Sequence, residues 1–390
     1  MKVMGSILLV LAMSVGGGLL SLPAVTSSSG FFYSCLTLFL IWLIMTTSAF
    51  FILEVCLALP KGTNLIGMAR LTLGIPGKLC MWFCYLVLLY CIMCVYISGG
   101  TDLINSAFVS LGLHLSIKIS TLIFTILMGS ITWLGIKIVD QTNRVLMSIK
   151  MLLLTLLILI LFPSVNGRNL TTGHLRDVHH TILPIIFSFG FAIIIPSLCD
   201  YLDNNIKTLR MVIFIGSIIP LVCFILWIYV VQGVIPQSTL SEINNSGAVV
   251  STLNRVLSHI GNPWVTTFIH LFTIICVLTA FLGVSLSLSD FIANGINQPK
   301  HGKTKIIIYA LTFLPPLIII LYQPYLFITA IRYAGIFIVI VLIFLPALMI
   351  KRIHLVNREE SKPSISKTIL IYLMIILSIS LLWFTSTHLL

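Results

Sequence analysis

The stretch V-G-G-G-L-L-S-L-P, from Val15 to Pro23, decides how this chain folds. It lies within the first long apolar run, near residues 6–26. Three consecutive glycines each cost a helix about 1 kcal/mol relative to alanine, and Pro23 removes a backbone donor. Inside a bilayer, freed backbone groups are tolerated only where protein or a wet cavity satisfies them. The stretch therefore predicts a membrane helix broken near its middle to face something polar. Close packing of another helix against the small residues is the alternative.

The composition places this stretch in a polytopic membrane protein. Of 390 residues, 59% are hydrophobic and only 8% are charged, whereas about 25% of a soluble domain is charged. The first apolar run is too long for a signal peptide and lacks a small-residue cleavage pattern. The nine cysteines are scattered without metal-ligand spacing, so we interpret them as packing thiols. We expect a single transmembrane domain over residues 1–390, with no metal site and no cofactor.

Apolar runs long enough to cross a bilayer, roughly 20 residues each, recur along the whole chain. We expect an all-α fold with eleven membrane helices, near residues 6–26, 33–57, 79–100, 119–138, 145–163, 181–199, 211–232, 264–289, 305–322, 326–350 and 367–387. The turns between them are short. The longest connection, residues 233–263, is expected to hold an interfacial segment.

Lysine and arginine residues in the loops set the expected orientation. With the N-terminus in the cytoplasm, Lys118, Arg168, Arg176 and Arg255 lie in outer loops, and almost all other basic residues lie in inner ones. Eleven crossings then leave the C-terminus on the outer side. Topology accounts for the formal charge of +12, so the lipid bilayer is an expected partner and nucleic acid is not.

A second interruption lies in the sixth apolar segment, L-P-I-I-F-S-F-G-F-A-I-I-I-P, from Leu183 to Pro196. Gly190 precedes Pro196 by six residues, much as Gly18 precedes Pro23 by five. The first and sixth helices cross the membrane in opposite directions. Matching broken helices in oppositely oriented halves are typical of an inverted repeat with its substrate site at the midplane. We expect two five-helix repeats, near residues 1–163 and 181–350, and a peripheral last helix at 367–387.

Six stretches in this order, spread over nearly the whole chain, carry a family resemblance. They are G-G-G-L-L-S-L-P (16–23), Y-I-S-G-G (96–100), I-P-S-L-C-D-Y-L-D-N-N-I-K-T-L-R (195–210), T-A-F-L-G-V-S-L-S-L-S-D-F (279–291), L-T-F-L-P-P (311–316) and R-Y-A-G (332–335). The chain resembles the bacterial aromatic amino acid permeases, which are tyrosine- and tryptophan-specific transporters of the amino acid–polyamine–organocation superfamily, and its tyrosine-specific members most.

This resemblance implies a leucine-transporter-type fold, with helices 1 and 6 broken. It also implies a symporter that carries an aromatic amino acid and a proton across the bacterial inner membrane into the cytoplasm. Two residues depart from the family pattern. Gly17 stands where relatives often have a different residue between two glycines, and Asp102 stands where a glutamate is expected.

A zwitterionic substrate at the midplane needs both charges satisfied, because unpaired charges are very costly there. Backbone N–H groups where the outer half-helix begins, near Gly18, are expected to hold the carboxylate. Carbonyls freed at the two breaks are expected to hold the ammonium, and Phe189 to stack on an aromatic ring. The expected substrate-binding residues are Val15, Gly16, Gly17, Gly18 and Leu19 in the first helix and Phe187, Ser188, Phe189, Gly190 and Phe191 in the sixth.

Lys150 is the last cation before the apolar part of the fifth helix, in N-R-V-L-M-S-I-K-M-L-L-L (143–154). One interpretation is that its ammonium reaches back to the membrane interface. The other is that it lies between the first and eighth helices, where sodium-driven relatives of this architecture hold a sodium ion, and that it carries the coupling proton. Burial disfavours the charged form of a lysine, so such a group can load and release a proton. Further candidates for a gate or relay are Glu54, Asp102, Asp200 and His270.

Several alternatives stay open at this point. The substrate can be tyrosine, tryptophan, phenylalanine or a broader set of neutral amino acids, and sodium can replace the proton. An intramembrane enzyme would need a nucleophile and a base, for which Cys84, Cys91 or Cys94 with His270 are the candidates, but no local motif joins them. A sensor that keeps the fold without transporting is a further alternative.

Overall fold

The computed structural model of the protein describes residues 2–134, 136–259, 263–296, 298, 300–356 and 365–389, and every regular element in these ranges is a helix. The elements are α1 (Lys2–Ser14), α2 (Gly17–Val25), α3 (Gly30–Ala58), α4 (Leu65–Ser110), α5 (Ile117–Trp133), α6 (Ile136–Leu161), η1 (Phe162–Ser164), α7 (Gly167–Leu170), η2 (Leu175–Val178), α8 (His179–Ser188), η3 (Gly190–Ile194), α9 (Ile195–Tyr201), α10 (Ile206–Val234), α11 (Gln237–Asn245), α12 (Val249–Ser258), α13 (Pro263–Gly295), α14 (Gly302–Tyr322), α15 (Phe327–Ile338), η4 (Val339–Phe344), α16 (Leu345–Val356) and α17 (Ile365–Leu389).

The all-helical membrane architecture predicted from the sequence is confirmed. Among the described residues, nine helices are long and apolar enough to cross a membrane, and the bent pair α1 and α2 makes a further span. The shorter apolar helix α5, Ile117–Trp133, lies at the expected fourth position. The long connection before α13 holds two short helices, α11 and α12, instead of one interfacial segment.

The first helix is broken where the three glycines stand. α1 ends at Ser14 and α2 begins at Gly17, and the two parts are bent by 47°. Gly16 at the break has extended backbone angles, φ −130° and ψ −143°. Its N–H donates to the carbonyl of Ser14 at 3.0 Å, so the break closes one local turn. Pro23 lies inside α2, in its last turn, and does not make the break.

The sixth helix is interrupted in a different way. α8 ends at Ser188, Phe189 leaves helical geometry at φ −102° and ψ 25°, and η3 follows as a 3₁₀ segment. A 3₁₀ segment keeps backbone hydrogen bonds three residues apart, so this helix is tightened and not opened. Pro196 lies in the first turn of α9, where a missing N–H costs nothing. The two interruptions therefore match in position but differ in kind.

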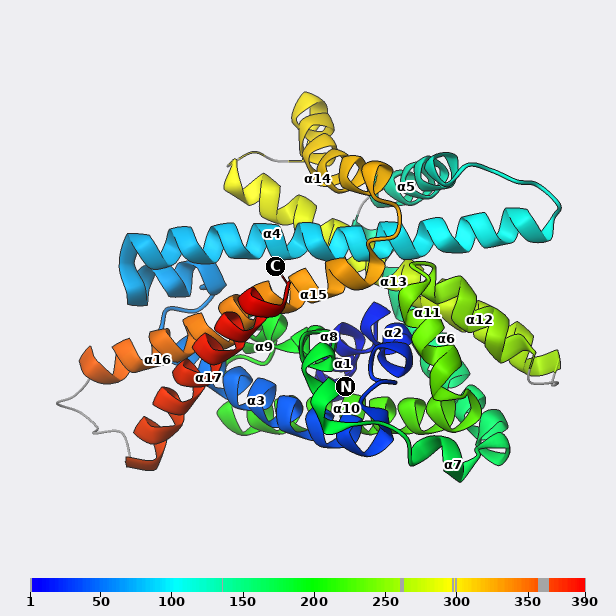
Figure 1. Cartoon of the computed structure of the whole chain (residues 1–390). Helices are drawn as coiled ribbons and strands as arrows, with labels where there is room; N and C mark the ends of the chain where they lie inside the picture. The colour runs from blue at the N-terminus through cyan, green and yellow to red at the C-terminus, as the bar shows by residue number, and fades with distance from the viewer. Residues whose placement is uncertain are drawn as a thin grey trace.

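The helices pack around the broken pair. α1 packs along α10, α2 packs against α8, and α13 packs along α6, while α4 and α15 lie side by side across the molecule (Figure 1). α17 lies at the periphery, against α16 and η4. Only 22% of the most apolar stretch of α17 is buried within the protein, compared with 72% of the corresponding stretch in Leu175–Tyr201, which contains the sixth helix. The interior of the bundle is therefore built around the two interruptions, and the last helix lies outside it.

Candidate functional site

A cavity of about 370 Å³ lies where the two interrupted helices meet. Its walls come from α1, α2, α8, η3 and α9, together with α4, α6, α13, α15 and η4. Of the residues that the sequence singles out, it is lined by Gly16, Gly18, Lys150, Phe187, Ser188 and Gly190. The structure thus brings both interruptions and the fifth-helix lysine to one hollow.

Four other expected substrate residues point elsewhere. Val15, Leu19, Phe189 and Phe191 are fully buried, and none of them lines the cavity. Phe189 packs edge-on against Phe224 of α10, with ring centroids 5.2 Å apart. Its neighbours Ser188 and Gly190 line the hollow, while the Phe189 ring lies against α10. Gly17 is the first residue of α2.

Phe189→Leu is expected to lower uptake of aromatic and aliphatic substrates by the same factor. The ring contacts Phe224 inside the helix bundle, so the change acts on packing and not on a substrate ring. Phe189 is fully buried, so the smaller leucine leaves a gap in the packing, and elution as a single species from a sizing column checks that the variant is folded. Uptake of a panel of labelled amino acids into proteoliposomes measures this. A loss confined to aromatic substrates would contradict the placement.

Gly18 lines the cavity and also makes a close helix contact. A Cβ built on it would overlap the hydroxyl of Ser188 and lie 3.1 Å from the Ser188 Cβ. A Cβ on Gly16 would lie 3.2 Å from the Tyr96 hydroxyl. Gly190 differs, since a Cβ there would meet only Ile338 at an ordinary 3.5 Å. Both interpretations of the glycine stretch therefore apply at Gly18, because it faces the cavity and lets α2 approach α8.

Lys150 is buried beside the first break. Its side chain is 1% exposed, and its Nζ donates to the carbonyl oxygen of Val15 at 2.5 Å. A second contact runs to the Thr279 hydroxyl of α13 at 3.4 Å. Among the residues that the structure describes, no carboxylate forms an ion pair with Lys150. The ammonium therefore occupies a cage of neutral oxygens between α1 and α13.

Glu54 and Asp200 lie outside the cavity and hold chain segments together. A Glu54 carboxylate oxygen pairs with the His354 imidazole at 2.9 Å and with the Lys367 ammonium at 2.6 Å, which ties α3 to α16 and α17. Asp200 at the end of α9 accepts a hydrogen bond from the backbone N–H of Gly62 at 3.0 Å. This bond joins the end of the sixth helix to the turn between α3 and α4.

Asp102 and His270 also lie apart from the cavity. The Asp102 carboxylate accepts hydrogen bonds from the Ser251 backbone N–H at 2.8 Å and from its hydroxyl at 2.6 Å. These bonds fasten α12 to α4 beside a second hollow of about 300 Å³, which Arg255 also lines. His270 is exposed on α13 and is not among the residues that line the central cavity.

Sequence reasoning missed the stripe of the fifth helix that faces the cavity. Asn143 and Met147 line the cavity together with Lys150, at i, i+4 and i+7 of α6. The Asn143 side-chain oxygen is buried and has no hydrogen-bond partner among the described residues. Helical spacing back from Lys150 is the signal that would have found it. Tyr85, Tyr96, Ser197 and Ser287 add further polar groups to the lining.

Comparisons with known proteins agree with this architecture. The sequence matches the tryptophan/tyrosine permease family over residues 1–385. It is 29% identical to "Glutamine transporter 2" of Aliivibrio fischeri, over 97% of this chain and 99% of that protein. It is 30% identical to "Tyrosine-specific transport system 1" of Haemophilus influenzae, over 86% of this chain and 84% of that protein. It is 31% identical to the "Tryptophan-specific transport protein" of the same organism, over 90% and 87%.

A solved structure shows the fold. Mhp1, a nucleobase-cation-symport-1 family transporter in a closed conformation with bromovinylhydantoin bound, superposes with a TM-score of 0.60. The two sequences are 12% identical, and the superposition covers 91% of this chain and 79% of the Mhp1 chain. The five-plus-five arrangement of the leucine-transporter type, with its first and sixth helices broken, is therefore the fold of this protein.

Proposed function

Because this chain belongs to the tryptophan/tyrosine permease family, we propose that it is a symporter that imports an aromatic amino acid together with protons by alternating access. The observation that carries the proposal is the ammonium of Lys150, which lies 2.5 Å from the Val15 carbonyl at the first break. A cation fixed at that point couples the charge state of α6 to the shape of the helix that contacts substrate.

The cavity has the groups that a zwitterion needs. The start of α2 carries the positive end of a helix dipole, which suits a carboxylate. The N–H groups of Gly17 and Gly18 precede that of Leu19, which donates to the Gly16 carbonyl at 3.2 Å. The last turn of α8, including Phe187 and Ser188, offers carbonyl oxygens to an ammonium. Gly16 and Gly18 carry no Cβ, so the hydroxyls of Tyr96 and Ser188 can lie close to the backbone at this end of the cavity.

The part of the cavity lined by Asn143 favours a substrate whose side chain ends in a polar group. Asn143 presents a buried oxygen that has no partner within the described part of the chain, and a buried acceptor left unpaired costs about 1–3 kcal/mol. A phenol hydroxyl can donate to it, whereas a phenyl ring cannot. We therefore favour tyrosine over phenylalanine. Glutamine is the second candidate, because its amide also donates and because a relative named for glutamine transport matches nearly end to end.

Asn143→Val is expected to weaken tyrosine uptake about tenfold, which is the loss of one buried hydrogen bond, while phenylalanine uptake changes little. The measurement is competition of labelled substrate uptake into proteoliposomes by tyrosine, glutamine, phenylalanine and tryptophan. Ser287→Ala, on another wall of the same cavity, serves as the matched control. Equal losses for tyrosine and phenylalanine would show that Asn143 does not accept a hydrogen bond from the tyrosine hydroxyl.

The cavity extends toward one side of the membrane. On the first helix it reaches back from the break to Ala12 and Met13, and on the sixth it reaches forward to Ile194 and Ser197. The two helices run in opposite directions, so both sets lie on the side of the N-terminus. The sequence predicts that side to be the cytoplasm of a bacterial cell, with the protein in its inner membrane. These features support an inward-facing state.

The test of the function is uptake into proteoliposomes with an imposed pH gradient and no sodium, competed with each of the twenty amino acids. Accumulation driven by pH alone and inhibited by tyrosine is the expected result. Accumulation that requires a sodium gradient would mean that the coupling ion is sodium and not the proton. Counterflow of labelled amino acid in the same vesicles separates a carrier from a sensor that only binds.

A further inference from the structure

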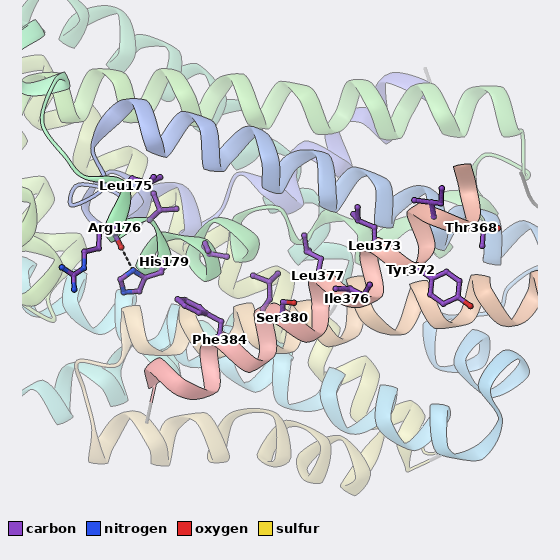
Figure 2. A pocket seen from close by; sticks show the side chains of 14 residues that line it. Leu175, Arg176, His179, Thr368, Tyr372, Leu373, Ile376, Leu377, Ser380 and Phe384 are labelled. Atoms are coloured by element: carbon purple, nitrogen blue, oxygen red, sulfur yellow. Dashed lines mark hydrogen bonds between the residues drawn. The ribbon is translucent and has the colours of Figure 1, made fainter. Parts of the chain in front are cut away.

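A groove larger than the central cavity lies on the outside of the bundle, between α17 and the start of the sixth helix. Its volume is about 1220 Å³, and it shares no lining residue with the central cavity. Apolar side chains of α17 form one wall, among them Leu373, Leu377 and Phe384 (Figure 2). Val178 and Ile182 lie on the opposite wall. The groove is open to the surface that faces lipid, because α17 is the peripheral helix of the fold.

A basic side chain lies at each end of the groove. Arg176 and His179 lie at one end, where the His179 ring packs edge-on against Phe384 at 5.9 Å (Figure 2). Arg176 is exposed and forms no ion pair with a carboxylate among the residues that the structure describes. The other end carries Thr368 and Tyr372, and the Lys351 ammonium lies 4.6 Å from the Tyr372 ring centroid.

The dimensions suit a phospholipid. From Thr368 to Phe384 the helix rises about 24 Å at 1.5 Å per residue, which is most of a hydrocarbon core about 30 Å thick. An acyl chain of one leaflet therefore fits inside the groove while its phosphate stays at the level of an interface. Arginine binds phosphate by paired, charge-assisted hydrogen bonds, and it does so best where little water competes.

We propose that this groove binds one anionic phospholipid, with its phosphate on Arg176 and an acyl chain along α17. The basic side chain of Arg176, which lines the groove itself, selects the occupant. An apolar groove alone would accept any lipid tail or a second copy of the chain. The Arg176 guanidinium, which has no carboxylate partner in the described ranges, favours a headgroup that carries net negative charge. The lipid would then fasten α17 to α8, the outer half of an interrupted helix.

The test titrates the purified full-length protein with phosphatidylglycerol or phosphatidylcholine and counts bound lipid by native mass spectrometry. Wild type should retain one phosphatidylglycerol about tenfold more tightly than phosphatidylcholine, and Arg176→Gln should remove that preference. Arg168→Gln, an exposed arginine on α7 that does not line the groove, is the charge control. Ser380→Trp, inside the groove, should weaken both lipids, while Ile379→Trp, 53% exposed but outside the groove, should not.

Two outcomes would overturn the proposal. The first is equal binding of phosphatidylglycerol by wild type and Arg176→Gln, which would mean that Arg176 does not bind the lipid phosphate. The second is a lipid-free dimer that Ser380→Trp converts to a monomer, because a second copy would then cover the groove. Arg176 and Ser380 are both exposed, so neither substitution disturbs the core of the bundle.

Discussion

Lys150→Gln is expected to abolish substrate accumulation driven by a pH gradient. A one-unit gradient coupled to one proton supports about tenfold accumulation, and the variant should reach about equal concentrations on both sides. The glutamine amide can still donate to the Val15 carbonyl, so the contact that Lys150 makes at the break has a replacement. What the amide cannot do is bind and release a proton. Counterflow of labelled substrate should therefore persist while accumulation is lost.

The matched control is Lys207→Gln, an exposed lysine at the start of α10, which should accumulate substrate like wild type. Lys150→Arg is a second informative variant, because arginine stays charged at every accessible pH and should also fail to couple. If Lys150→Gln still concentrates substrate on a pH gradient alone, the lysine is not the proton carrier. Asp102, Glu54 and His270 would then be the groups to examine.

Gly18→Leu is expected to reduce transport to background while the protein still inserts. A Cβ at this position overlaps the Ser188 hydroxyl, so a leucine would push α2 and α8 apart where both line the cavity. Overpacking of this kind costs about 1–3 kcal/mol, and loss of the substrate's backbone partners adds to it. Substrate binding to detergent-purified protein and uptake into proteoliposomes measure the effect. Elution as a single species from a sizing column checks that the variant is folded.

Two other glycines serve as controls for Gly18. Gly5 lies in the first turns of α1 and has no atom within 4 Å of an added Cβ, so Gly5→Leu should transport normally. Gly190→Ala should also be tolerated, because its Cβ meets Ile338 at 3.5 Å. Normal transport by Gly18→Leu would show that neither the close contact of α2 with α8 nor the approach to the backbone matters for function.

The sequence predicted the helices and the two interruptions because composition and glycine or proline placement act locally. Lys150 could be singled out because it is the last cation before an apolar run; its coupling role stays a prediction. The direction of Phe189 was not predictable, since it depends on a 3₁₀ segment whose start a linear pattern does not fix. The partners of Glu54 lie about 300 positions away along the chain, and only tertiary packing brings His354 and Lys367 to it.

The burial of Lys150 inside the membrane bundle has an electrical consequence. A proton that reaches this amine from one side and leaves to the other carries one unit charge through the bilayer, and an amino acid zwitterion carries no net charge. If Lys150 carries the proton, each import moves one positive charge across the bilayer, and voltage drives uptake as directly as acidity does. A unit charge crossing 100 mV is worth about 2.3 kcal/mol, or roughly fiftyfold in concentration ratio. The protein would then concentrate its substrate on membrane voltage even when the pH is the same on both sides.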